Sequence, residues 1–448
     1  MRRSSLIGHV SELLDTIRRT NRPADQLVRD FFRTRHYLGA KDRRFINESV
    51  FNILRNFKLL CTYCKVTLTA AGQSSVPAPS LAMYAAYEVK LQGESVESLL
   101  PDISGLWRVF VPAVECEAFL LALASAALPA DIKSDPVKLL SVKYSFPESI
   151  VRELVHRSGL DEAEELLAAL NQPAPTTIRV NTLKTTVEEC RLALKSEGVE
   201  SSPTVLSPVG LVLEKRVNAH SLRTFRQGWF EIQDEGSQLL SMLTESMPGS
   251  LVVDACAGGG GKTLHLAALM RNEGILISID VEEYRLNNIR ERVIRSGVSI
   301  NRSYLAGQDH TSIRALEDNA DVVLIDAPCS GVGTFRRNPG AKLFFGEANV
   351  DHFSRTQRSV LETYARLAKP GGRLVYATCT ILRKENEEVV EWFLGEHPEF
   401  SLVNAPEILW RQGVITGAEL PGGSLYLTLL SHKTSTDSFF AAVMTRTA

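Results

Sequence analysis

The sequence predicts an α/β protein in three parts: an all-helical region, a small α+β region and a C-terminal α/β domain with a parallel, doubly wound sheet. The 448 residues exceed the length of one ordinary domain. Apolar residues recur at helical spacing through the first third. From about Met247, apolar runs typical of strands alternate with amphipathic helical segments. We expect the three parts to span residues 1–140, 141–245 and 246–448.

The N-terminal region is expected to be helical and basic. Apolar spacing predicts helices over residues 6–20, 25–33 and 42–60. The first sixty residues hold thirteen Lys or Arg against six Asp or Glu. Such a segment is typical of a nucleic-acid footprint, but a set of solvated helix surfaces has the same composition. Charge alone does not decide between the two.

The middle region reads as a small α+β unit. Its pattern predicts a helix over residues 161–170 and, after a proline-bounded turn, a strand over 176–180. A helix over 187–196 and strand-like runs at 210–213 and 228–232 complete it.

The C-terminal region predicts alternating strands and helices. Strand-like runs cover 251–255, 274–280, 321–327 and 372–378, and helices fit 263–271, 282–296, 351–368 and 384–396. The runs are continuously apolar, as expected for parallel strands that are buried on both faces.

Composition and cysteine usage narrow the class of protein. Hydrophobic residues make up 44% and charged residues 23% of the chain, the balance of a soluble globular protein. No apolar segment after the N-terminus indicates a secretory signal, and the longest apolar run, 118–130, is shorter than a membrane span. We therefore expect a cytoplasmic protein without membrane association, and a monomer.

The seven cysteines argue against a disulfide framework, because they are scattered and odd in number. Cys61 and Cys64 form a lone C-x-x-C pair with no second pair or histidines at matching spacing. We expect no metal site.

A glycine run after the first C-terminal strand is the candidate cofactor loop. It contains Cys256, Ala257, Gly258, Gly259, Gly260, Gly261 and Lys262. Glycines between a strand and a helix let the backbone turn tightly and approach a ligand closely. The next strand ends in Asp280, and a carboxylate there can accept the ribose hydroxyls of an adenosine.

Two ligands compete for this loop. Gly261-Lys262-Thr263 imitates the end of a nucleotide-triphosphate loop, with Asp326 as its second acid, but Cys256 stands where that motif needs glycine. S-adenosylmethionine carries the adenosine without the phosphates. The residues favour S-adenosylmethionine over a nucleotide triphosphate.

Two cysteines each follow a later strand, Cys329 in Asp326-Ala327-Pro328-Cys329 and Cys379 in Thr378-Cys379-Thr380. If the strands are neighbours, both thiols face the crevice where open α/β sheets bind ligands. Methylation of carbon 5 of cytosine can use such a pair, because one group must add to carbon 6 as a thiolate and another must help to release the adduct. Asp326 could bind the cytosine edge and relay a proton. The residues alone do not say which thiol attacks.

The ordered motifs of residues 228–440 resemble the Sun (Fmu-like) family of RNA cytosine-5 methyltransferases. The motifs are 228–230, 233–238, 254–263, Asp280, Asp309, 326–331, 336–339 and 378–380, and residues 40–45 add a weaker match in the helical region. The resemblance implies a class I (Rossmann-like) methyltransferase domain, preceded by a NusB-like helical RNA-binding domain. It also implies 16S ribosomal RNA as substrate and S-adenosylmethionine as cofactor.

The resemblance also assigns roles. It implies that residues 256–262, Asp280, Asp309 and Asp326 line the cofactor site. Cys379 would be the nucleophile, Cys329 would assist product release, and Lys262 would assist the active-site acid. The sequence departs from the family at Gly258-Gly259, where alanine-proline is usual, and at Thr380, where serine is common.

Two other functions stay open at this point. An ATP-driven RNA enzyme would use the Gly-Lys-Thr loop, and a non-catalytic RNA-binding factor would rely on the helical third. The basic segment from Arg336 to Lys342, directly after Cys329, is expected to contact RNA phosphates rather than to be a solvated loop.

Overall fold

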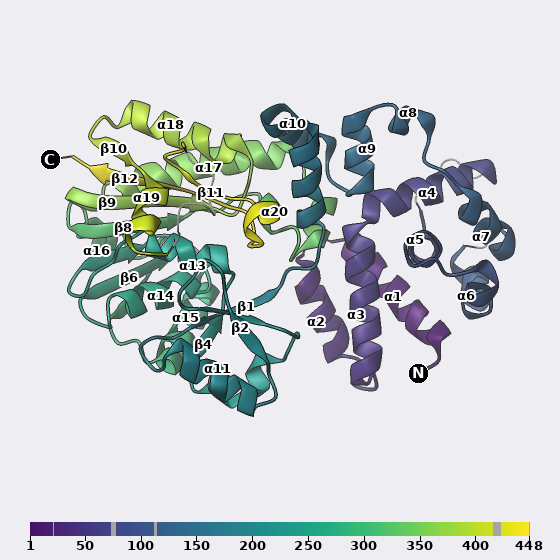
Figure 1. The fold of residues 1–448 in the computed structure, drawn as a ribbon, viewed down its shortest axis with the longest axis horizontal. Coiled ribbons are helices and arrows are strands. Elements are labelled where there is room, and N and C mark those ends of the chain that lie inside the picture. The colour runs from purple at the N-terminus through teal and green to yellow at the C-terminus, as the bar shows by residue number, and fades with distance from the viewer. Residues whose placement is uncertain (21, 73–77, 112–113, 415–422, 448) are drawn as a thin grey trace. The chain divides into compact units, whose positions relative to one another are not determined.

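The computed structural model of the chain describes residues 1–20, 22–72, 78–111, 114–414 and 423–447. These residues form two compact units whose elements are labelled in Figure 1. The first unit comprises Met1–Gln172 and Phe335–Glu347, and the second comprises Pro173–Thr334 and Ala348–Ala448. In the described part of the chain, no helix is both long and apolar enough to cross a membrane.

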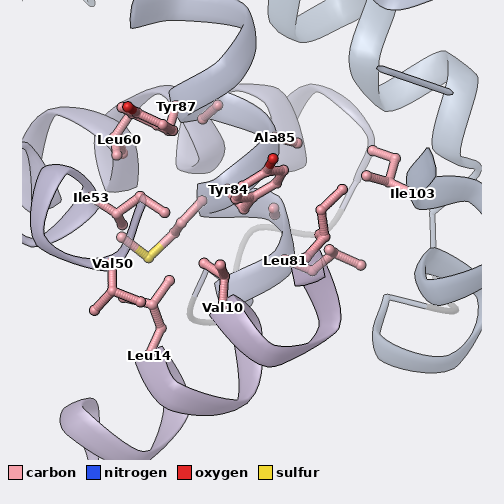
Figure 2. Close-up of a cluster of buried hydrophobic side chains, with 14 of the residues drawn as sticks. Val10, Leu14, Val50, Ile53, Leu60, Leu81, Tyr84, Ala85, Tyr87 and Ile103 are labelled. Carbon is pink, nitrogen blue, oxygen red and sulfur yellow. The ribbon is translucent and has the colours of Figure 1, made fainter. Parts of the chain in front are cut away.

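The first unit is helical and is built around one fully buried helix. Every residue of α5 (Ser80–Tyr87) is buried, as expected for a helix that is apolar on all sides. Figure 2 shows its Leu81 and Tyr84 among side chains of α1 (Arg3–Arg18), α3 (Ala40–Arg55), α4 (Phe57–Ala70) and α6 (Val96–Phe110). The other helices are α2 (Ala24–Arg33), η1 (Glu88–Gln92), α7 (Cys116–Ser125), α8 (Ala130–Lys133), α9 (Pro136–Lys143) and α10 (Glu148–Leu170).

Two helix predictions in this unit need correction. The helix expected over residues 42–60 is two helices, because Asn56 leaves helical geometry with φ −107° and ψ 21° between α3 and α4. The helix expected over 161–170 is the second half of α10, which is interrupted at Gly159 by φ 82° and ψ 175°. Only glycine adopts that backbone conformation readily.

The second unit contains a small antiparallel sheet with strand order β2-β3-β1-β4. Its strands are β1 (Thr176–Val180), β2 (Ser201–Pro203), β3 (Gly210–Leu213) and β4 (Phe230–Ile232), accompanied by α11 (Val187–Ser196), η2 (Ala219–Ser221) and α12 (Arg223–Arg226). Its own small core joins Ile178 of β1 and Leu211 of β3 to Cys190 and Leu194 of α11.

The larger sheet has the order β10-β12-β9-β8-β5-β6-β7, with β11 also pairing with β12. Its strands are β5 (Leu251–Asp254), β6 (Ile275–Asp280), β7 (Asn301–Leu305), β8 (Ala320–Asp326), β9 (Ala368–Thr378), β10 (Phe400–Val403), β11 (Leu427–Leu429) and β12 (Phe439–Arg446). Strands β5 to β9 are parallel, but β12 pairs antiparallel with β9. The expected parallel sheet therefore continues into an antiparallel edge.

Helices cover both faces of this sheet. Successive residues of a strand point to opposite faces, so neighbouring residues of β5 pack against different helices. Val252 packs into a core with α13 (Glu235–Met242), α14 (Gly261–Leu269) and α19 (Ala405–Arg411). Its neighbour Val253 packs into a second core with α17 (Glu347–Ala365) and α18 (Glu387–Glu396). The remaining helices of the unit are α15 (Glu283–Ser296), η3 (Val332–Thr334), α16 (His310–Arg314), η5 (Arg383–Glu385) and α20 (Ser431–Thr434), while η4 (Pro339–Leu343) belongs to the first unit.

Candidate active site

The glycine loop joins the end of β5 to the start of α14 and is fixed to the end of β6. Gly258 and Gly260 have φ values of 53° and 81°, which side-chain-bearing residues rarely adopt. The Gly258 N–H donates to Asp280 Oδ2 at 2.8 Å. A Cβ on Gly260 would lie 2.8 Å from Cγ1 of Ile289 on α15. The sequence therefore needs glycine at these two positions for the loop to follow this path.

The carboxylate of Asp280 lies at the end of β6, as expected. It is 5% exposed, and its Oδ1 accepts from the Glu282 N–H at 2.9 Å. Asp309 lies after β7 at the start of α16, where its Oδ2 accepts from the Leu305 N–H at 2.6 Å. Asp280 is thus joined to the glycine loop directly, whereas Asp309 accepts from the backbone of β7, the strand that precedes it.

A partly buried ion pair joins the glycine loop to the end of β8. Lys262 Nζ donates to Asp326 Oδ2 at 2.6 Å. Burial disfavours the charge of Lys262, but the attraction of Asp326, Asp254 and Cys379 outweighs burial and raises the pKa of this lysine. Lys262 is therefore a fixed positive charge.

Asp254, at the end of β5, is fully buried. Burial raises its pKa to about 7, although Thr263 Oγ1 donates to its Oδ2 at 2.7 Å. Cys256 is also buried enough that the pKa of its thiol is raised, so its sulfur is a poor candidate for a nucleophile.

The two candidate thiols lie in contact, with 3.3 Å between Sγ of Cys329 and Sγ of Cys379. They come together because β8 and β9 are parallel neighbours, with Asp326 paired to Ala377. The hydrogen bond to Cys379, and then burial, raise the pKa of Cys329 well above that of an ordinary thiol. The raised pKa keeps Cys329 protonated, and its sulfur lies within hydrogen-bonding distance of the Cys379 sulfur.

A buried glutamate that the sequence analysis missed links the two cysteine loops. Glu385 is 0% exposed and accepts from the Ser330 N–H at 2.8 Å and from Thr380 Oγ1 at 3.1 Å. Its carboxylate also accepts from the Ser330 hydroxyl and, at 3.1 Å, from Gln357 Nε2. Since Ser330 follows Cys329 and Thr380 follows Cys379, one carboxylate holds both loops. Its position six residues beyond Cys379 gave no indication of this role in the sequence.

The prediction that the basic segment after Cys329 contacts RNA phosphates is wrong for its two ends, Arg336 and Lys342. Arg336 and Lys342 are each 7% exposed, within the first unit. Lys342 Nζ donates to Asn171 Oδ1 at 2.6 Å and to the Tyr144 carbonyl at 3.1 Å. A buried lysine of this kind cannot reach an RNA phosphate, and positive charge in the sequence did not reveal its burial.

All seven cysteines of the chain lie among the described residues and are free thiols. Cys61 and Cys64 lie on α4, and burial raises the pKa of both thiols. Within the described residues, no group of three or more His, Cys, Asp or Glu side chains is arranged to hold a metal ion.

Comparison with known proteins adds independent information. The family described as 16S rRNA methyltransferase RsmB/F matches residues 241–445, and the RsmF/B-like ferredoxin-like domain matches residues 146–220. A probable ribosomal RNA small subunit methyltransferase B from Bacillus subtilis is 32% identical over 314 residues, covering 70% of this chain and 69% of the relative. A protein of the same name from Synechocystis is 26% identical and covers 91% of this chain and 92% of its own length.

Solved structures agree with this match. One covers 99% of both chains with a TM-score of 0.77 at 27% identity. A methyltransferase homologue from Pyrococcus horikoshii is 26% identical, covers 71% of this chain and 100% of its own, and has a TM-score of 0.59. The fold is a class I methyltransferase sheet with a helical N-terminal region. The chain belongs to the 16S rRNA methyltransferase RsmB/F family and is an S-adenosylmethionine-dependent methyltransferase of small-subunit ribosomal RNA.

Proposed function

We propose that the enzyme methylates carbon 5 of a cytosine in 16S ribosomal RNA through a covalent adduct with Cys379. The observation that carries the proposal is the pair of thiols 3.3 Å apart, each following one of two neighbouring parallel strands. The ion pair of Lys262 and Asp326 at the end of β8 supports it.

Cys379 is the attacking thiolate. Its neighbour Cys329 has a raised pKa and keeps its own proton, which it can donate to a thiolate at Cys379, 3.3 Å away. Lys262 adds a favourable interaction with an ionised Cys379. Both contacts stabilise negative charge on sulfur, which is the form that adds to carbon 6 of cytosine.

The residues around the glycine loop fit an adenosine-containing cofactor. Asp280 is a nearly buried carboxylate at the end of the second parallel strand, where ribose hydroxyls are usually bound. We assign residues 256–262, Asp280, Asp309 and Asp326 to the cofactor site. Bound S-adenosylmethionine supplies an electrophilic methyl group.

Asp326 and Lys262 bind the cytosine edge. A carboxylate accepts a hydrogen bond from the exocyclic amino group, and the lysine ammonium counters the negative charge that thiolate addition puts on the ring. The side chain of Asp326 is 31% exposed, so it can contact a base that has left its stack.

Cys329 assists release of the adduct. While Cys379 is an anion, it raises the pKa of Cys329. Formation of the carbon–sulfur bond removes that anion and with it one cause of the raised pKa, although burial of Cys329 remains. Cys329 then loses its own proton to solvent, and its thiolate takes the proton from carbon 5. The electron pair of that carbon–hydrogen bond re-forms the ring double bond as the bond between carbon 6 and Cys379 breaks and the thiolate leaves.

The domain order supports a division of labour along the chain. We propose that residues 1–140 form a NusB-like RNA-binding domain, 141–245 a small RNA-binding or linking domain, and 246–448 the catalytic domain. Several cations of the first helices are already ion-paired, such as Arg29 with Asp25 at 3.0 Å and Arg44 with Glu48 at 2.8 Å. RNA binding by this region therefore relies on fewer free charges than its composition indicates.

Methyl transfer to unmethylated 16S RNA tests the proposal. Purified protein is incubated with S-adenosylmethionine carrying a labelled methyl group, and the RNA is digested to nucleosides. We expect the label in 5-methylcytidine. Label in any other nucleoside would refute the cytosine-5 assignment while leaving the family assignment intact.

A further inference from the structure

The candidate cofactor loop contains four consecutive glycines, Gly258 to Gly261, and two arginines bind its carbonyl oxygens. Such a run has high backbone freedom and gains little restraint from its own side chains. Arg292 of α15 donates to the Gly259 carbonyl, and Arg179 of β1 donates to the Gly261 carbonyl at 2.6 Å. These contacts fix alternate peptide groups of the loop.

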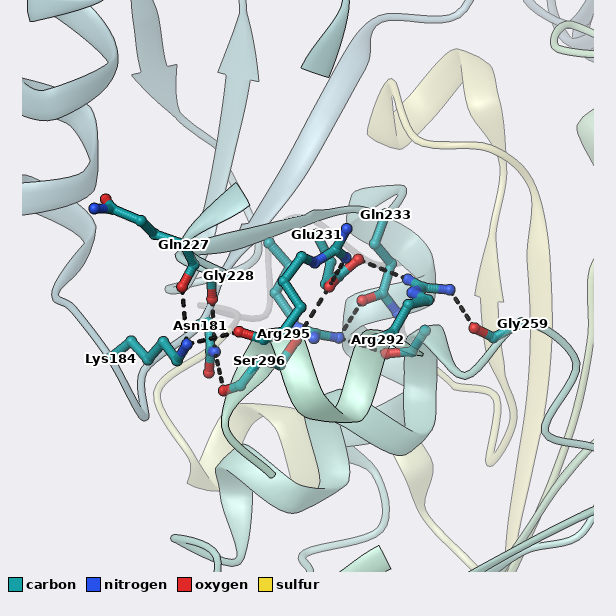
Figure 3. A network of polar contacts seen from close by, with 12 residues as sticks. Asn181, Lys184, Gln227, Gly228, Glu231, Gln233, Gly259, Arg292, Arg295 and Ser296 are labelled. Carbon is teal, nitrogen blue, oxygen red and sulfur yellow. Dashed lines mark hydrogen bonds and ion pairs between the residues drawn. The ribbon is translucent and has the colours of Figure 1, made fainter. Parts of the chain in front are cut away.

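A buried carboxylate from the small sheet holds Arg292 in place. Glu231 of β4 is 2% exposed, and its Oε2 accepts from Arg292 Nη2 at 2.8 Å. Its Oε1 accepts from Arg295 and, at 3.2 Å, from the Ser296 hydroxyl. Burial disfavours the charge of Glu231, but Arg292 and Arg295 outweigh it and lower the pKa of this carboxyl. Figure 3 shows Arg292 bridging Glu231 and Gly259.

Arg179 is anchored in the same way. It is 1% exposed and also donates to the side-chain oxygen of Gln233, which follows β4. Burial lowers the pKa of Arg179 to about 9, so the guanidinium is still charged at neutral pH. Both loop contacts therefore come from charged donors, which make stronger hydrogen bonds than neutral ones.

The small sheet is fixed against α15 at a second place. Asn181 Nδ2 donates to the Ser296 carbonyl at 2.9 Å and to the Gly228 carbonyl at 2.8 Å (Figure 3). A Cβ on Gly228 would lie 2.0 Å from the Arg295 carbonyl oxygen, so the two backbones are in direct contact. The side of α15 that carries Arg292 is thus rigidly placed by residues outside the large sheet.

We propose that Arg292, anchored by Glu231, is a positioning residue that holds the four-glycine loop in the conformation that binds S-adenosylmethionine. The small sheet then has a role besides RNA binding, because it supplies the anchor. The inference rests on the cofactor site assigned above. It predicts an effect on cofactor affinity and little effect on the chemical step.

Titration calorimetry of the full chain with S-adenosylmethionine tests this. Arg292→Leu is expected to raise Kd by about tenfold, the loss expected for one charge-assisted hydrogen bond. At saturating cofactor, kcat is expected to stay near the wild-type value. Arg290→Leu on the exposed side of the same helix is the matched control and should leave Kd unchanged.

A rescue separates loop positioning from general support of the fold. A Cβ on Gly259 would lie 3.2 Å from Arg292 Nη1, a tight contact that Arg292→Leu removes, and apart from its chain neighbours no other atom of the described residues lies within 4 Å of it. Adding Gly259→Ala to Arg292→Leu reduces the freedom of the loop and should recover about two- to fivefold in Kd. If Arg292→Leu does not unfold cooperatively, Glu231→Gln, which removes the anchor but keeps the arginine, should raise Kd in the same direction.

An unchanged Kd in both Arg292→Leu and Glu231→Gln would overturn the inference. So would an equal loss of kcat and affinity that Gly259→Ala does not reduce, since that pattern indicates a structural role only. Absence of binding by the wild type would overturn the cofactor-site assignment together with this inference. Because calorimetry uses no RNA, the measured Kd values can be interpreted even if the cytosine-5 proposal fails.

Discussion

Two buried lysines, Lys262 in the second unit and Lys342 in the first, occupy opposite electrostatic surroundings. Their exposed fractions are 9% and 7%. Lys262 faces the Asp326 carboxylate and its pKa is raised. Lys342 bonds to neutral oxygens, and burial together with the charge of Arg55 lowers its pKa well below the ordinary value.

The difference shows that the role of a buried lysine can be predicted only when the groups that it contacts are known. The carboxyl edge of the large sheet supplies acids at strand ends, so a lysine there becomes a fixed charge that also interacts with Cys379. The surroundings of Lys342 in the helical unit supply carbonyl and amide oxygens, so this lysine is a structural hydrogen-bond donor. The first should control catalysis and the second should control stability.

The largest effect is expected at the thiol that depends on Lys262. Cys379→Ala should lower methyl transfer by about 10⁴-fold or more, as removal of a covalent nucleophile does. Labelled-methyl incorporation into 16S RNA measures this, and the melting temperature should stay near the wild-type value. Activity within tenfold of wild type would show that Cys379 is not the nucleophile.

Lys262→Met tests the fixed charge itself. It leaves Asp326 without its partner and removes the cation that favours an ionised Cys379. We expect kcat to fall by about 10²- to 10³-fold, the usual cost of losing a charged group that stabilises developing charge. Since the folded pKa of Lys262 is raised, its stabilising charge is fully present at neutral pH and is lost only as the pH rises through that value. A loss of wild-type activity below pH 9 that the variant does not share would mean that Lys262 loses its charge there, which would contradict the raised pKa.

Glu385→Gln tests whether the two cysteine loops must be held together. The amide would oppose donors from Ser330, Thr380 and Gln357 with an NH₂ group, so one or more contacts are lost. We expect kcat to drop about tenfold, with a stability loss of about 1–3 kcal/mol. Exposed Glu388→Gln on the following helix is the control. Equal kcat in both variants would show that Glu385 does not position the thiols.

Lys342→Met should have the smallest effect on catalysis and a measurable effect on stability. A lysine with a lowered folded pKa binds fewer protons than it does in the unfolded chain between that value and 10.5, so wild-type stability should rise with pH across this window. The variant should lack that rise while its methyl transfer stays close to wild type. Thermal unfolding at pH 7 and pH 9.5 measures the contrast. Loss of activity without a stability change would make Lys342 a functional cation after all.

The parts of the fold that the sequence predicted are those with strong local patterns. The apolar runs at β5, β6, β8 and β9 matched the strands closely, because parallel strands buried on both faces have a continuous apolar signature. Strand β7, Asn-Arg-Ser-Tyr-Leu, was missed because it is a partly exposed edge strand with a polar sequence. The antiparallel strand β12 was missed because its pairing with β9 joins residues more than sixty positions apart.

The candidate site shows the same division. Asp280, Asp326, Cys329 and Cys379 follow strands and could be found from their positions in the chain. Glu385 and Arg292 could not, since their importance depends on contacts made only after folding. Lys342 was misread because nothing in its sequence neighbourhood indicates that the first unit buries it.

The central claim, that Cys379 attacks and Cys329 assists release, is tested most directly by a covalent trap. Wild type, Cys379→Ala and Cys329→Ala are incubated with S-adenosylmethionine and unmethylated 16S RNA and then separated on denaturing gels. The account predicts that Cys329→Ala accumulates a protein–RNA adduct that survives denaturation, whereas Cys379→Ala forms none. An adduct in Cys379→Ala and none in Cys329→Ala would contradict it and exchange the roles of the two thiols.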